Sequence, residues 1–160
     1  MTTPAATTTD DSAPAATFDV AIVGAGYVGL PLAQVFAEAG SRVVLLDVSE
    51  ERVAQILRGH SYIEDVPSEK LATLVSERGL HATTDYDALR DADAILIALP
   101  TPLSKQREPD LSIVLAATEQ IAKRLRKGHL VVLESTTYPG TTREKLLPIL
   151  ERDSGLVAGR

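Results

Sequence analysis

Short runs of apolar residues are spaced along the chain, and polar or helix-patterned sequence separates them. Most of the runs are continuous rather than alternating, which is typical of parallel strands that are buried on both faces of a sheet. The pattern therefore predicts strands at about 20–23, 43–46, 80–84, 92–99 and 130–133.

Apolar residues recur at helical spacing between these runs, which predicts a helix in most of the connections. The expected helices cover about 27–39, 49–57 with Ser49 as N-cap, 67–78, a single turn at 85–90, and a stretch that Asp110 caps and that carries apolar residues to Leu125. Arg124, Arg126 and Lys127 are expected at the C-terminal end of that last helix, where cations complement the helix dipole. Thr141 and Glu144 form the pattern of a capping box, which predicts the start of a further helix.

Strands that alternate with helices indicate an α/β fold, because parallel strands need crossover connections. We expect a Rossmann-like doubly wound parallel sheet of five to six strands with helices on both faces, as one domain over residues 18–160. Residues 1–17 are rich in Thr, Ala, Pro and Asp and are expected to form a disordered tail, because they cannot bury enough apolar surface to offset ordering entropy.

Three glycines follow the first expected strand in the spacing G-x-G-x-x-G, at Gly24, Gly26 and Gly29. The first allows a tight turn, the second lets a pyrophosphate approach the backbone, and the third lets the next helix pack close to the strand. Asp47 ends the second strand, where a carboxylate binds a ribose 2′-hydroxyl and repels a 2′-phosphate, although Arg52 lies nearby in sequence. The arrangement predicts a dinucleotide site that prefers NAD over NADP.

The composition of the chain argues against several other classes of function. The formal charge of −6 argues against non-specific nucleic-acid binding, which needs a basic face. The chain has no cysteine, so it contains no thiolate metal site or cysteine nucleophile, and its three histidines are scattered, so we expect no metal. No apolar run has the length of a membrane span, and the first 17 residues lack the features of a secretory signal, so we expect a cytoplasmic protein without a membrane partner.

Four motifs in the same order resemble the NAD-binding domain of the UDP-glucose/GDP-mannose dehydrogenase family. They are GAGYVGLPLA at 24–33, DAILIALPTPL at 93–103, EPDLS at 108–112 and ESTTYPGTT at 134–142. The resemblance covers the chain from about Phe18 onward. The amino-acid sequences of the last three motifs most resemble the branch of the family that acts on UDP-N-acetylglucosamine and UDP-N-acetylmannosamine.

The resemblance implies oxidation of the C6 alcohol of a UDP-hexose or UDP-N-acetylhexosamine to a carboxylate with two NAD. A catalytic role is implied for Thr136, which would lie near the nicotinamide and position a water and the reacting oxygen. Thr101 could instead be a turn residue between two prolines, and Thr136 could satisfy loop backbone groups. The implied cofactor-binding residues are Gly24, Gly26, Tyr27, Val28, Gly29, Asp47, Arg52, Thr101 and Thr136.

The family's second oxidation passes through a thiohemiacetal on a cysteine, and neither that cysteine nor the central helix and nucleotide-sugar domain occurs in these residues. We therefore expect this chain to bind NAD without completing catalysis, and the full-length protein to be a homodimer. Two alternatives stay open, namely a stand-alone NAD-binding or sensing module and one half of a split dehydrogenase. The coding sequence after Arg160 distinguishes these possibilities. A different NAD-dependent alcohol oxidoreductase of similar architecture fits the 135–142 stretch less well.

Overall fold

The computed structural model describes residues 17–103 and 108–159. The expected tail lies outside the described residues, apart from Thr17. The elements, in chain order, are β1 (Phe18–Val23), α1 (Gly29–Glu38), β2 (Val43–Leu46), α2 (Glu50–Leu57), α3 (Ser68–Glu77), β3 (Leu80–Thr83), the 3₁₀ turn η1 (Tyr86–Asp91), β4 (Ala92–Ile97), α4 (Ser112–Ala122), β5 (Leu130–Leu133), the π-helical segment η2 (Thr142–Leu146) and α5 (Leu147–Ser154).

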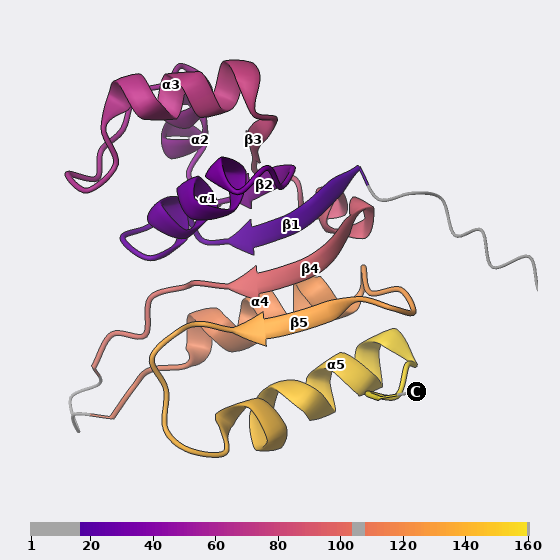
Figure 1. Cartoon of the computed structure of the whole chain (residues 1–160). Coiled ribbons are helices and arrows are strands. Elements are labelled where there is room, and N and C mark those ends of the chain that lie inside the picture. The colour runs from indigo at the N-terminus through magenta and orange to yellow at the C-terminus, as the bar shows by residue number, and fades with distance from the viewer. Residues whose placement is uncertain (1–16, 104–107, 160) are drawn as a thin grey trace, which may run out of the picture.

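The strands form one parallel sheet in the order β3-β2-β1-β4-β5 (Figure 1). Strand β1 lies in the centre and pairs with β2 through Val20 and Val43, and with β4 through Val20 and Ala94. The carboxyl ends of all five strands therefore lie at the same edge of the sheet. After β3 the chain crosses back to the other side of β1, where β4 and β5 are added. This topology confirms the predicted Rossmann-like fold with five strands in the described part of the chain.

Alternate residues of β1 and of β2 belong to two separate hydrophobic clusters, one on each face of the sheet. Val20 and Ile22 of β1 pack with residues of α1, α2 and α3, whereas Ala21 and Val23 pack with α4, η1 and Leu146. Because both faces are covered along the central strands, β1 and β2 need apolar residues on both sides. This coverage of both faces explains why the sequences of β1 and β2 are continuous apolar runs.

Helix α2 begins as the sequence predicts. The hydroxyl of Ser49 accepts a hydrogen bond from the backbone N–H of Arg52 at 3.3 Å, which satisfies one of the unpaired amides of the first turn. Glu50 and Glu51 follow in that turn, where their charges favour the positive end of the helix dipole. The cap therefore fixes where the chain turns after Asp47.

The end of α4 differs from the prediction. The helix stops at Ala122, so Arg124, Arg126 and Leu125 lie beyond it. Arg126 donates to the carbonyl of Ala92 at 2.9 Å, and Arg124 pairs with a carboxylate of η1 at 2.8 Å. Arg124 also donates to the Gln120 carbonyl of the last turn of α4 at 3.0 Å, so it binds both its own helix and a neighbouring element, whereas Arg126 binds the strand beside the turn that leads into β5.

The predicted caps of the last two helices are also wrong in detail. Asp110 accepts a hydrogen bond from the Ser112 amide at 2.9 Å, but Leu111 is the residue that flanks α4. Thr141 already has helical backbone angles, and its hydroxyl donates to the Tyr138 carbonyl at 2.7 Å. No capping box forms, because a side chain that closes the preceding turn is not available to the helix amides.

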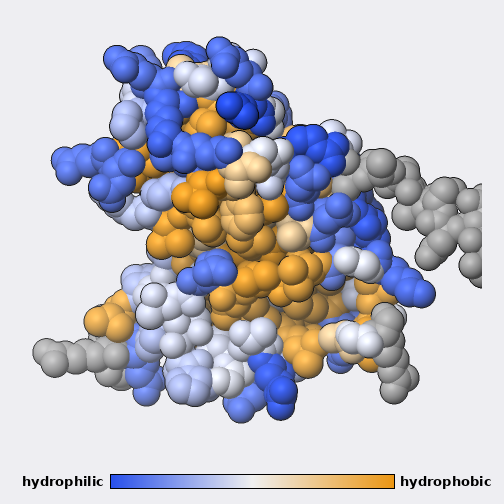
Figure 2. All heavy atoms as spheres, in the orientation of Figure 1, coloured by the Kyte–Doolittle hydropathy of each residue, from blue (hydrophilic) through white to orange (hydrophobic). Residues whose placement is uncertain are grey.

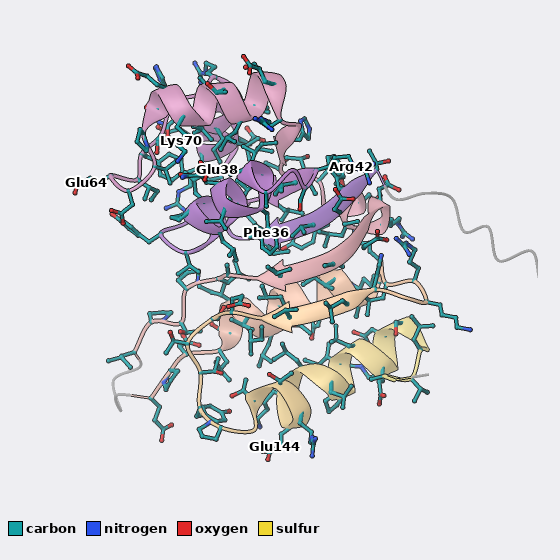
Figure 3. The ribbon with its side chains drawn as sticks, viewed as in Figure 1. Phe36, Glu38, Arg42, Glu64, Lys70 and Glu144 are labelled. Atoms are coloured by element: carbon teal, nitrogen blue, oxygen red, sulfur yellow. The ribbon has the colours of Figure 1, made fainter. Side chains whose placement is uncertain are left out.

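Helix α1 is tied to α3 at the surface of the domain. Figure 3 shows Glu38 and Lys70 reaching toward one another, and their charged atoms form an ion pair of 2.5 Å. Phe36, on the same helix, lies toward the sheet and packs against the cluster of the α1 face. Because exposed ion pairs contribute little to stability, the apolar contact of Phe36 contributes more to the packing of α1 than the ion pair does.

Apolar surface remains exposed beside α1. Figure 2 shows it as a continuous region over the part of the sheet that Figure 1 assigns to β1, β4 and β5. Leu130 of the edge strand β5 and Val35 of α1 are each 60% exposed. A cavity of about 740 Å³ lies between the N-terminal end of β5 and the inner side of α5.

Replacement of Gly29 by alanine is expected to destabilise the domain. A Cβ there would stand 1.7 Å from the carbonyl oxygen of Gly24, so α1 would have to move away from β1. We expect a loss of about 3 kcal/mol or more, seen in a thermal melt as a fall in Tm of roughly 6–12 °C. Gly26→Ala is the matched control, because no atom lies within 4 Å of its Cβ position and the Tm stays near that of the parent. Equal melting temperatures for both variants contradict the packing described for Gly29.

Candidate functional site

The turn between β1 and α1 lies at the carboxyl edge of the sheet, and its three glycines have different surroundings. Gly24 has a backbone φ of +106°, which residues with a side chain rarely adopt. A Cβ at this position would stand 2.5 Å from the carbonyl oxygen of Ala98. Gly29 lies against Gly24 itself. Gly26 faces open space, with nothing within 4 Å of the Cβ position. The turn is therefore packed on the protein side and open on the solvent side.

The amides that follow this opening are available to a ligand. Within the described residues, the N–H groups of Gly26, Tyr27, Val28 and Gly29 have no hydrogen-bond acceptor. They precede or begin a ten-residue helix that has no acidic side chain in its first turn. Because the helix dipole is positive here, the open turn favours a bound anion such as a phosphate. The helix begins at Gly29, two residues after the predicted start at about Tyr27.

Asp47 joins the end of β2 to the glycine turn. Its carboxylate is buried, accepts the Ala25 N–H at 2.9 Å through Oδ2 and accepts the Ser49 N–H at 2.9 Å through Oδ1. The guanidinium of Arg52 lies 3.5 Å from Oδ2 and is half exposed. These contacts hold a carboxylate beside the open turn, where the sequence analysis expected a ribose-binding group.

Tyr62 is a site residue that the sequence analysis missed. It lies in the connection between α2 and α3, and its hydroxyl donates to the carbonyl oxygen of Ala25 at 2.6 Å. The guanidinium carbon of Arg52 stands 5.7 Å from the centre of its ring, within the range of a cation–π contact. Burial and then the charge of Asp47 raise the pKa of Tyr62 to about 12. The available signal was an aromatic residue next to apolar Ile63 in a connection that is mostly polar.

The loops after β4 and β5 are joined by two hydrogen bonds. Ser135 accepts the Leu99 N–H at 3.0 Å through its hydroxyl, and the hydroxyl of Thr101 donates to the Thr136 carbonyl at 2.7 Å. The side chain of Thr136 is exposed and has no acceptor or donor within the described residues. Thr101 and Thr136, both predicted from the sequence to contact the cofactor, are therefore brought together in the structure.

The three loops lie side by side at one edge of the sheet. Ala98 packs against Gly24, and the Leu99–Thr101 segment is bonded to the loop after β5. Asp47, Arg52 and Tyr62 flank the glycine turn on its other side. The cavity between β5 and α5 is lined by different residues and does not belong to this site.

No metal or membrane feature competes with this interpretation in the part of the chain that the structure describes. Residues 17–103 and 108–159 contain no group of three His, Cys, Asp or Glu side chains that could hold a metal ion. Over the same ranges, every helix is too short or too polar to cross a membrane.

Curated relatives share this stretch of sequence. The chain is 39% identical over 137 residues to the UDP-N-acetyl-D-glucosamine 6-dehydrogenase of Pseudomonas aeruginosa, which covers 86% of the chain and 32% of that protein. It is 38% identical over 142 residues to Protein CapL of Staphylococcus aureus, with 89% and 32% covered. The chain therefore spans about a third of the length of these relatives.

Solved structures give the same picture. A ternary complex of GDP-mannose dehydrogenase from Pseudomonas aeruginosa superposes with a TM-score of 0.82 at 31% identity, over 86% of this chain and 33% of the other. A UDP-D-ManNAc dehydrogenase from Pyrococcus horikoshii superposes with a TM-score of 0.82 at 37% identity, over 88% and 34%. Both matches leave two thirds of the longer proteins without a counterpart here.

A family model settles the assignment of the domain. The model of the UDP-glucose/GDP-mannose dehydrogenase family, NAD binding domain, matches residues 18–158, which is nearly the whole described chain. The open glycine turn and the buried carboxylate beside it suit the cofactor in that description. The chain belongs to the UDP-glucose/GDP-mannose dehydrogenase family, and the matched residues are its NAD-binding domain.

Proposed function

We propose that residues 18–160 are the NAD-binding domain of a nucleotide-sugar 6-dehydrogenase, which oxidises the C6 alcohol of a UDP-hexose or UDP-N-acetylhexosamine to the uronate with two NAD. One observation carries the proposal: the open glycine turn, the carboxylate of Asp47 and the exposed hydroxyl of Thr136 all lie at one edge of the sheet. The names of relatives that act on UDP-N-acetylglucosamine and UDP-N-acetylmannosamine support the substrate class.

The glycine turn binds the pyrophosphate of NAD in this proposal. The free amides from Gly26 to Gly29 donate to phosphate oxygens, and the missing Cβ of Gly26 leaves room for them. Gly24 keeps the turn tight. Tyr27 and Val28 are 82% and 54% exposed, so their side chains can lie against the dinucleotide. Burial of these apolar surfaces by the ligand adds to its affinity.

Asp47 gives the site its preference for NAD. The carboxylate has lone pairs beyond those used by Ala25 and Ser49, and these can accept the hydroxyls of the adenosine ribose. A 2′-phosphate would place negative charge against a buried carboxylate. Arg52 is close enough to attract that phosphate, but its ion pair with Asp47 offsets part of its charge.

Thr101 and Thr136 form the side of the site toward the reacting carbon. Thr101 contacts the cofactor from the loop after β4, while its hydroxyl holds the Thr136 carbonyl. The exposed Thr136 hydroxyl positions a water and the reacting oxygen by hydrogen bonding. Bound NAD supplies the oxidising equivalents, and the protein orients the substrate alcohol toward it.

The sugar and its second oxidation need residues beyond this chain. The 160 residues contain no cysteine, so the thiohemiacetal step of the family has no nucleophile here. We propose that the full-length protein is a cytoplasmic homodimer whose partners are NAD and a UDP-sugar, without nucleic acid or membrane. A stand-alone NAD-binding module or half of a split dehydrogenase is the alternative.

The 160-residue chain is expected to bind NADH without turning over a UDP-sugar. Fluorescence titration should show saturable NADH binding, and incubation with NAD and UDP-N-acetylglucosamine should produce no NADH. Gly26→Ala is expected to weaken NADH binding by about tenfold or more, because a methyl group enters the space where the pyrophosphate approaches the backbone. Turnover of the UDP-sugar by the isolated chain would refute the expectation that this chain binds NAD without completing catalysis. NADH binding by Gly26→Ala that equals the parent's would refute the role of Gly26 in the pyrophosphate site.

Asp47→Ala is expected to weaken NADH binding by about tenfold, because a hydrogen bond from a ribose hydroxyl to a charged acceptor is lost. NADPH binding should fall less or improve, because the repulsion disappears while Arg52 remains. The decisive quantity is the ratio of the two affinities, since general damage to the fold lowers both equally. An unchanged NADH affinity, or an unchanged ratio, rejects the role assigned to Asp47.

A further inference from the structure

The two peptide groups on either side of Ala25 are held by side chains from outside the glycine turn. The carbonyl oxygen of Ala25 accepts the phenolic hydroxyl of Tyr62 at 2.6 Å, and the N–H of Ala25 donates to Asp47 at 2.9 Å. In a regular helix, the Ala25 carbonyl would accept the amide of Gly29, but that bond is absent here. Tyr62 replaces a helix donor and leaves the Gly29 amide free.

The hold on the carbonyl also orients the next amide. A trans peptide is planar, and its C=O and N–H bonds point in opposite directions. All described peptides of the chain are trans, including this one. When Tyr62 draws the Ala25 carbonyl toward the α2–α3 connection, the Gly26 N–H must point away from Tyr62. No protein acceptor in the described residues meets this N–H.

Tyr62 is itself held in place. Its neighbour Ile63 is 5% exposed, and Val66 is 1% exposed, so both anchor the connection in the cluster of the α1 face. The Ser61 N–H donates to the hydroxyl of Ser68 at 3.0 Å, which fixes the connection to the start of α3. Arg52 covers the ring. The hydroxyl is thus presented by a packed segment rather than by a free loop.

We propose that Tyr62 is a positioning residue of the NAD site, which orients the Gly26 amide toward the pyrophosphate through the Ala25 carbonyl. The inference rests on the proposed function of the glycine turn as the pyrophosphate site. In this assignment the hydroxyl of Tyr62 acts through the Ala25–Gly26 peptide and does not touch the cofactor. Burial and the charge of Asp47 raise the pKa of Tyr62 to about 12, so the phenol is a hydrogen-bond donor at neutral pH.

Tyr62→Phe tests the assignment, because phenylalanine keeps the ring that packs beside Arg52 and removes only the hydroxyl. We expect the affinity for NADH and for ADP-ribose to fall about five- to tenfold, as for the loss of one hydrogen bond. The affinity for adenosine, which has no phosphate, should stay the same. The amide resonance of Gly26 should shift in the ligand-free variant, which a direct contact between Tyr62 and the cofactor does not explain.

Thr118→Val is the matched control. The Thr118 hydroxyl also donates to a backbone carbonyl, that of Val114 at 2.7 Å, but it is buried on α4 against the opposite face of the sheet. This variant should bind NADH like the parent and leave the Gly26 resonance unshifted. The comparison separates loss of a hydroxyl from loss of the hydroxyl at the glycine turn.

The outcomes separate this inference from the function on which it rests. If the parent binds NADH and Tyr62→Phe binds it equally well, the positioning role is wrong and the NAD site stands. An equal loss of affinity for adenosine also overturns the role, because it shows general damage to the site. Failure of the parent chain to bind NADH overturns both. A selective loss for NADH and ADP-ribose together with a shifted Gly26 amide supports the assignment.

Discussion

Helix α1 reaches the end of β1 only because neither Gly24 nor Gly29 carries a side chain. A Cβ on Gly29 would fall 1.7 Å from the Gly24 carbonyl oxygen, and one on Gly24 would fall 2.5 Å from Ala98. This contact determines where the helix begins, and therefore where its free amides lie. It also sets the distance between the glycine turn and the loop after β4. The rest of the site is built around a backbone that has no room for movement on its inner side.

The side chains beside the turn act on its backbone from separate elements. Asp47 comes from the end of β2 and Tyr62 from the α2–α3 connection, and both bind the main chain of Ala25. Arg52 of α2 lies between them. A turn whose peptides are already fixed loses little further freedom when a ligand binds, so more of the contact energy appears as affinity. The loops of Thr101 and Thr136 are tied mainly to each other and are more exposed.

The sequence was sufficient for the parts of the structure that depend on local pattern. Continuous apolar runs predicted the strands, and Ser49 predicted the start of α2. The glycine spacing with Asp47 predicted the turn and its carboxylate. Tyr62 was missed because its hydrogen bond joins residues far apart in the chain, and no spacing rule encodes such a contact. The end of α4 was misplaced for a related reason, since Arg126 finds its acceptor on Ala92 of a neighbouring strand.

The uncovered sheet surface around β5 has a thermodynamic consequence. Each square ångström of apolar surface removed from water contributes roughly 25 cal/mol. Leu130 remains 60% exposed, and the cavity beside α5 leaves more apolar surface in contact with solvent. Any layer that packs on this surface adds its burial energy to the same sheet. The unfolding free energy of the 160-residue chain is therefore a lower bound on the stability that this sheet reaches when the surface is covered.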